Sequence, residues 1–106
     1  MDITNKAVEI IKNFLLQNNY DIVNIILFGS QATNSQSAAS DFDFLVIINQ
    51  NIDRKNRWNL IMKIKRILAQ HNIPNDIILI SEKEFNETKN NIGHITYYAL
   101  KQGVSL

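Results

Sequence analysis

The residue types best suited to chemistry lie on either side of a ten-residue gap. Gly29 and Ser30 follow one apolar run, and Asp41 and Asp43 begin a second one. Small residues at a turn after a strand let a phosphate approach backbone N–H groups. Two carboxylates one residue apart on a strand project to the same face, where they can bind Mg²⁺. The spacing therefore predicts a site for chemistry on a nucleoside triphosphate.

A third carboxylate, Asp76, precedes the apolar run 77–80. If the strand that it opens lies beside the strand of Asp41 and Asp43, all three carboxylates reach the same place. Two like charges about 4 Å apart repel by about 4 kcal/mol at an effective dielectric constant of ~20, so such a cluster needs a divalent cation or a proton. We expect two Mg²⁺ ions, which would stabilise the attacking and leaving oxygens of an in-line displacement. As an alternative, Asp76 fits an ordinary turn, because it closely follows Pro74.

Each of these residues is assigned a role. Asp41 and Asp43 are predicted to bind metal, and Asp76 to bind the second metal and to accept a proton from the attacking hydroxyl. The Gly29 backbone and the Ser30 hydroxyl are predicted to hold the pyrophosphate leaving group. Taken alone, a Gly-Ser pair is only a turn, and an Asp-x-Asp motif is usually solvated surface. Their joint occurrence beside apolar strands, where unpartnered acids are destabilising, favours the functional interpretation.

The elements that must position these residues alternate between helix and strand. Apolar spacing predicts one helix over 4–18 and a second from the N-cap Asp53 to residue 70. Two further helical segments are predicted after the capping box that begins at Ser81. Gly103 is predicted to end the last helix in a left-handed conformation. Predominantly apolar runs predict strands over 22–28, 41–48 and 76–80. This order indicates an α/β (α+β) fold, in which helices pack against a small mixed β-sheet.

The long helix after Asp53 has two predicted faces. Its core stripe comprises Trp58, Ile61, Ile64, Ile67 and Leu68. The other side carries Arg54, Lys55, Lys63 and Arg66. Such residues are typical of a solvated helix face, and they would also suit docking of an acidic partner or a polynucleotide.

Composition narrows the class of protein. With 106 residues, 45% of them hydrophobic, the chain is expected to form one domain over 1–106. It has no cysteine, which excludes disulfides and thiolate metal sites, and His71 and His94 lack partners at ligand spacing. We expect no membrane span and see no signal peptide, so a cytoplasmic location is predicted. The net charge of +1 ranks a pure nucleic-acid binder last among the functions considered.

The pattern of Gly29-Ser30, ten residues and Asp41-Phe42-Asp43 is similar to the signature of the polymerase-β-like nucleotidyltransferase superfamily. Within it, the chain resembles the minimal nucleotidyltransferase (MNT) subfamily in residues 40–44, in Asp76 at the third carboxylate, and in the ending 97–104. The resemblance implies the nucleotidyltransferase fold and Mg²⁺-dependent transfer of AMP from ATP to an acceptor hydroxyl. Many members act as antitoxins of a HEPN-domain ribonuclease toxin, in studied cases by adenylylating a toxin tyrosine.

One departure from the subfamily pattern concerns the phosphate turn. Members commonly read Gly-Ser-x-Ala-Arg-Gly, whereas Thr33 and Asn34 stand at the arginine and glycine positions here. Loss of a cation near the phosphates would weaken triphosphate binding. Two alternatives stay open: a module of this fold that neutralises its partner by contact alone, and a nucleotidyltransferase acting on a small molecule or an RNA end. Because the chain is small, a second protein or a second copy of the chain is expected to complete the pocket.

Overall fold

The computed structural model describes residues 3–29 and 41–106. Its elements follow the order α1 (Ile3–Gln17), β1 (Ile22–Phe28), β2 (Phe42–Ile48), α2 (Arg54–Gln70), β3 (Asn75–Ser81), α3 (Glu82–Thr88), α4 (Ile95–Gln102) and β4 (Val104–Ser105). The strands form one sheet in the order β3-β2-β1-β4. β2 pairs antiparallel with β1 and parallel with β3, so the predicted mixed sheet is confirmed.

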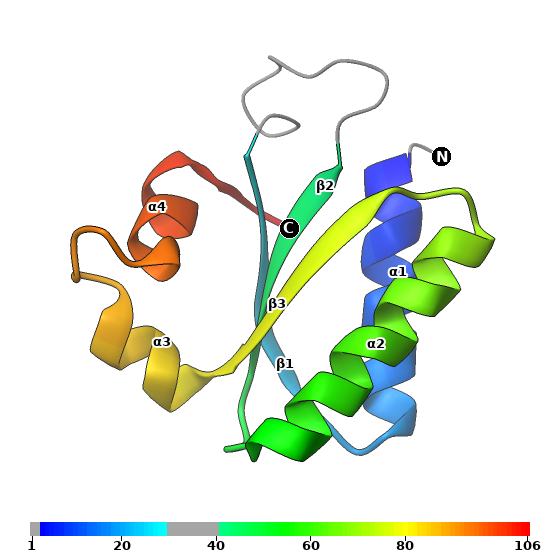
Figure 1. The fold of residues 1–106 in the computed structure, drawn as a ribbon, viewed down its shortest axis with the longest axis horizontal. Helices are drawn as coiled ribbons and strands as arrows, with labels where there is room; N and C mark the ends of the chain where they lie inside the picture. Colours follow the sequence, from blue (N-terminus) through cyan, green and yellow to red (C-terminus); the bar gives the residue numbers. More distant parts are fainter. Residues whose placement is uncertain (1–2, 30–40) are drawn as a thin grey trace.

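Helices cover both faces of this sheet (Figure 1). α1 and α2 lie on one face, over a large core cluster that includes Phe44, Val46 and Ile48 of β2. α3 and α4 lie on the other face, over a smaller cluster to which β2 contributes Leu45 and Ile47. Because strand side chains alternate, successive residues of β2 point into opposite cores.

Side chains at the helix ends explain where the helices begin. Asp53 caps α2, because its Oδ1 accepts a hydrogen bond from the Asn56 N–H at 2.8 Å. Ser81 caps α3 in the same way, with its hydroxyl oxygen accepting from the Glu84 N–H at 3.1 Å. The Glu84 carboxylate forms an ion pair with Arg57 of α2, so it ties α3 to α2.

The predicted core stripe of α2 was wrong at Trp58. The side chain of Trp58 is 61% exposed, and the buried stripe comprises Leu60, Ile64 and Leu68. At 100° per residue, Trp58 stands about 120° around the helix from Ile64. Trp58 therefore belongs to the outer face of α2.

The predicted left-handed conformation of Gly103 was also wrong. Its backbone is extended, with φ −87° and ψ 169°, and the chain continues directly into β4. Val104 of β4 pairs with Leu27 of β1. A Cβ atom at position 103 would overlap the backbone of Leu27 and the side chain of Ile26, so glycine is needed for close approach to the sheet.

Candidate functional site

The candidate site lies where β1 ends and where β2 and β3 begin, at the upper end of the sheet in Figure 1. Phe28, the last residue of β1, pairs with Asp43 in the antiparallel ladder. Asp76 pairs with Asp43 in the parallel ladder. Because neighbouring strands lie about 4.8 Å apart, this register brings Gly29, Asp43 and Asp76 to one end of the sheet.

The two strand carboxylates share the sheet face that α3 and α4 cover. Asp43 is two and four residues from Leu45 and Ile47 of the smaller cluster, so its side chain points to the same face of the sheet. Asp76 is four residues from Ile80 and points to that face for the same reason. Asp43 is half-buried, whereas Asp76 and Asp41, which directly precedes β2, are exposed. The prediction that β3 lies beside β2 is therefore confirmed, and Asp43 lies opposite Asp76 in this pairing.

Burial and neighbouring charge raise the pKa of the Asp43 carboxyl above its ordinary value. Burial is the largest cause, followed by the charge of Asp76 and then by that of Asp41. All three causes disfavour an ionised carboxylate at this position. A divalent cation would relieve that penalty, and carboxylate oxygens are ligands that Mg²⁺ prefers. The Asp43 carboxylate is therefore chemically suited to a divalent cation.

Asp76 has a cationic partner of its own. Its Oδ1 lies 3.3 Å from Lys65 Nζ, and its side chain is 63% exposed. The same ammonium group donates to the Asn75 carbonyl at 3.4 Å. Within the described ranges 3–29 and 41–106, no three His, Cys, Asp or Glu side chains converge as a metal site. Asp76 would have to leave Lys65 to join Asp43 at a metal.

Gly29 lies against the Asp43 carboxylate. Its φ is +76°, a backbone conformation that residues other than glycine rarely adopt. A Cβ atom at this position would overlap Asp43 Oδ2. The turn after β1 therefore needs glycine both for its conformation and for space. Ser30, Thr33 and Asn34 lie outside the described residues, so the predicted phosphate turn is described only at Gly29.

Sequence reasoning missed Lys65 as a partner of the site. Lys65 lies on α2, a different element from the one that carries Asp76, and no motif links the two positions. An open hollow of about 520 Å³ adjoins this ion pair, lined by Lys65, Ala69, Asn72, Ile73, Pro74 and Asn75. The hollow joins the outer face of α2 to the strand end where Asp76 lies.

Comparison with known proteins gives one family and a group of similar structures. A family model described as polymerase beta, nucleotidyltransferase, matches residues 9–103. No curated protein gives a significant match to the sequence. In the part of the chain that the structure describes, no helix is long and apolar enough to span a membrane.

Several similar solved structures are toxin–antitoxin complexes. A complex with AMP-PNP is 21% identical over 92% of this chain and 69% of that chain, with a TM-score of 0.59. A complex of a tri-AMPylated Shewanella oneidensis HEPN toxin with its MNT antitoxin is 22% identical over 98% and 71%, with a TM-score of 0.58. The MntA–HepT complex is 20% identical over 96% and 69%, with a TM-score of 0.54. At these identities the likeness establishes a shared fold.

Proposed function

Because this chain belongs to the polymerase-β nucleotidyltransferase family, we propose that it transfers AMP from ATP to a hydroxyl group on a partner protein. The acceptor is a tyrosine of a HEPN-type toxin, and the chain acts as the antitoxin. The observation that carries the proposal is the placement of Asp43, which lies against Gly29 and in register with Asp76. The Shewanella oneidensis complex of an AMPylated HEPN toxin supports the choice of acceptor, because its antitoxin shares this fold.

The chain's own groups have distinct tasks in the proposed reaction. Asp41 and Asp43 would hold Mg²⁺, together with Asp76 once it leaves Lys65. Mg²⁺, when bound, neutralises charge on the triphosphate and on the departing pyrophosphate. The Gly29 backbone and the Ser30 hydroxyl hold the pyrophosphate end of ATP.

The transfer itself exchanges one phosphorus–oxygen bond for another. The acceptor oxygen bonds to the α-phosphorus of ATP, and the bond from that phosphorus to the bridging oxygen of the β-phosphate breaks. Asp76 accepts the proton that the acceptor hydroxyl loses. The products are an AMP ester of the acceptor and pyrophosphate.

The direct test is transfer of label from ATP labelled at the α-phosphate. The purified chain is incubated with Mg²⁺, labelled ATP and a HEPN-domain protein, and we expect label on the partner protein. A chelator should abolish the transfer. Label found on RNA or on a small hydroxyl compound instead would support the alternative acceptor class.

A second candidate function is neutralisation by contact alone. The ion pair of Asp76 with Lys65 favours it, because the third carboxylate is engaged elsewhere in this structure. Replacing both Asp41 and Asp43 by Asn separates the two functions. If the double variant neutralises the toxin as well as the unaltered chain does, catalysis is not the mechanism.

A further inference from the structure

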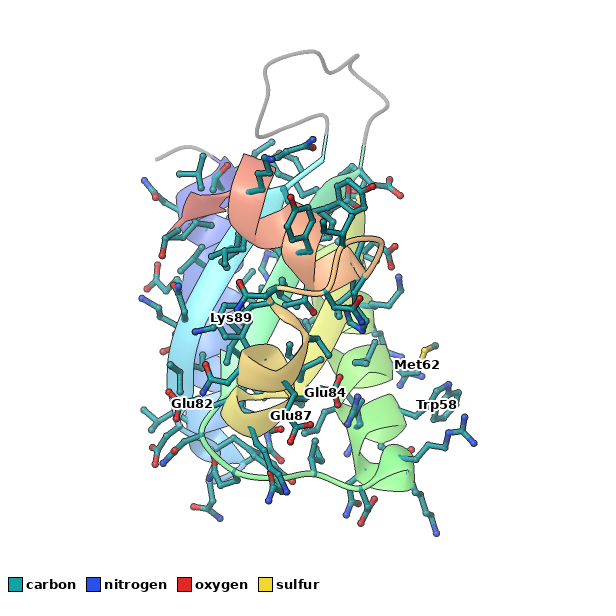
Figure 2. All side chains as sticks on the ribbon, turned by 90° about the vertical axis from the view of Figure 1, so that its left-hand side faces the viewer. Trp58, Met62, Glu82, Glu84, Glu87 and Lys89 are labelled. Carbon is teal, nitrogen blue, oxygen red and sulfur yellow. The ribbon has the colours of Figure 1, made fainter. Side chains whose placement is uncertain are left out.

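Large apolar side chains occupy the outer face of α2, where a solvated helix normally carries polar ones. Trp58 is 61% exposed and Met62 is 40% exposed. Figure 2 shows that both side chains point away from the body of the protein, on the same side of α2. Trp58, Met62, Lys65 and Ala69 follow spacings of four, three and four residues, which align them along one stripe. We call these four residues the α2 seam.

Positive charge accompanies the α2 seam. The helix contains six Lys and Arg residues and no Asp or Glu. Arg57 pairs with Glu84 and Lys65 with Asp76. Within the described ranges the remaining four cations of α2 form no ion pair: Arg54, Lys55, Lys63 and Arg66. At 100° per residue, Lys55 and Arg66 stand about 60° and 80° around the helix from Trp58, so they border the seam.

On the side of α2 that faces α3, acidic residues outnumber basic ones, because α3 carries three Glu and one Lys. In Figure 2, Glu82, Glu84 and Glu87 belong to α3, and Trp58 and Met62 point away from that helix. An acidic partner would be attracted to the border formed by Lys55 and Arg66 and repelled from α3. Arg54 stands about 40° from Trp58 on the side of Arg57, so cations border the seam on both sides. The acidic residues of α3 disfavour only an approach across that helix, because like charges across an interface are unfavourable.

We infer that the α2 seam is the docking surface for an acidic amphipathic helix of the protein that carries the acceptor hydroxyl, an inference that rests on the proposed function. Trp, Met and Arg are the residue types enriched at the centres of protein interfaces. From Trp58 to Ala69 the seam spans roughly 17 Å, about three helical turns, which matches the contact of one helix with another. The seam ends at the hollow beside Lys65 and Asn75, so a helix docked along it leads to Asp76.

The apolar part of the seam favours a protein over a polynucleotide. Phosphate contacts require cations alone, and they leave the side chains of Met62 and Ala69 without a function. A helix with apolar residues on one side and carboxylates beside them satisfies both parts of the surface.

Calorimetric titration with the HEPN-domain protein tests this docking surface. Trp58→Ala should raise the dissociation constant at least about tenfold, because exposed aromatic anchors carry much of the binding energy of interfaces. Arg66→Glu should weaken binding more at low salt than at high salt, because screening reduces the effect of charge. The matched controls are Leu16→Ala and Lys6→Glu, which are exposed residues of a different helix, α1, and should bind normally. Circular dichroism checks that each variant is folded.

The outcomes separate this inference from the proposed function. If Trp58→Ala and Arg66→Glu bind as tightly as the controls, the docking surface is refuted and the proposed transfer stands. If the seam variants lose binding but the unaltered chain labels no partner, the surface stands and the transfer fails. If the unaltered chain does not bind the HEPN-domain protein, both fail. A single-stranded RNA oligonucleotide that binds the unaltered chain but not Trp58→Ala would replace the protein partner with a polynucleotide.

Discussion

The two faces of the sheet differ in how much apolar surface they bury and in whether they carry the acidic residues of the candidate site. The face under α1 and α2 buries the larger cluster, to which Ile64 and Leu68 of α2 and Ile11 and Leu15 of α1 contribute. The face under α3 and α4 buries the smaller cluster, and its strand residues continue into Asp43 and Asp76. The acids therefore lie on the face with less core, where polar groups stay close to solvent. We infer that one face supplies most of the stability and the other carries the chemistry.

The largest predicted effect falls on transfer activity at the carboxylate face. Asp43→Asn should lower the rate of AMP transfer on the order of a thousandfold, because metal-bound charge stabilisation amounts to several kcal/mol. Single-turnover transfer of the α-phosphate label measures this rate. Asp21→Asn, an exposed change at the opposite end of β1, is the matched control and should retain full activity. If Asp43→Asn keeps its transfer activity, the reaction does not depend on this face of the sheet.

The next largest effect is the loss of stability on the other face. Ile64 is fully buried in the larger cluster, whereas Ile78 is partly buried against the smaller one. Ile64→Ala should lower the free energy of unfolding by about 3 kcal/mol and Ile78→Ala by about 1 kcal/mol, because the cost follows the burial that is lost. Urea titration measures both values. Equal losses would contradict the inferred difference between the two faces.

Replacement of Gly29 should affect stability and chemistry together. Gly29→Ala forces a side chain into a left-handed backbone and against Asp43 Oδ2. We expect a loss of about 1–2 kcal/mol in unfolding free energy, together with reduced transfer because the carboxylate must move. Gly93→Ala is the control, since its φ is also positive but a Cβ atom there meets nothing. If the two variants transfer AMP equally well, the contact with Asp43 has no role in catalysis.

The smallest effect is the pH dependence of stability without metal. Because burial raises the pKa of folded Asp43 above its unfolded value, its penalty is absent at low pH, where the carboxyl is protonated in both states. The penalty appears as pH rises through the unfolded and then the folded pKa. In chelator, Asp43→Asn should therefore be more stable than the unaltered chain near neutral pH, by at most about 4 °C in Tm, and the difference should shrink in acid. Thermal scans across pH test this. A lower Tm for the variant at neutral pH would contradict the raised pKa.

The sequence predicted the strands of the site well because their signals are local. Each of β1, β2 and β3 contains an apolar run of at least four residues, and the register that pairs Asp43 with Asp76 follows once β3 lies beside β2. The family relationship expected from the glycine–serine and aspartate motifs is confirmed by the match over residues 9–103. The roles of the individual site residues stay predictions.

The features that sequence reasoning missed depend on contacts between distant elements. Trp58 was placed in the core because it fits an apolar spacing with Ile61 and Ile64, yet the helix is rotated so that Leu60 faces inward. Hydrophobicity alone cannot distinguish these rotations, because large apolar residues lie on more than one side of α2. The Lys65–Asp76 ion pair and the pairing of β4 with β1 likewise join residues that no local pattern connects.

The crossover helix α2 also limits how this architecture can change. α2 has 17 residues, or roughly 25 Å, and the neighbouring strands of seven residues each span roughly 23 Å. The helix thus carries the chain back along the full height of the sheet and delivers Asp76 level with Asp43. Insertion of a turn into α2 would shift the third acid away from the first two, whereas an insertion between β2 and α2 would leave their alignment intact. Divergence among homologues should accordingly accumulate at the far end of the sheet, while the length of this helix stays constant.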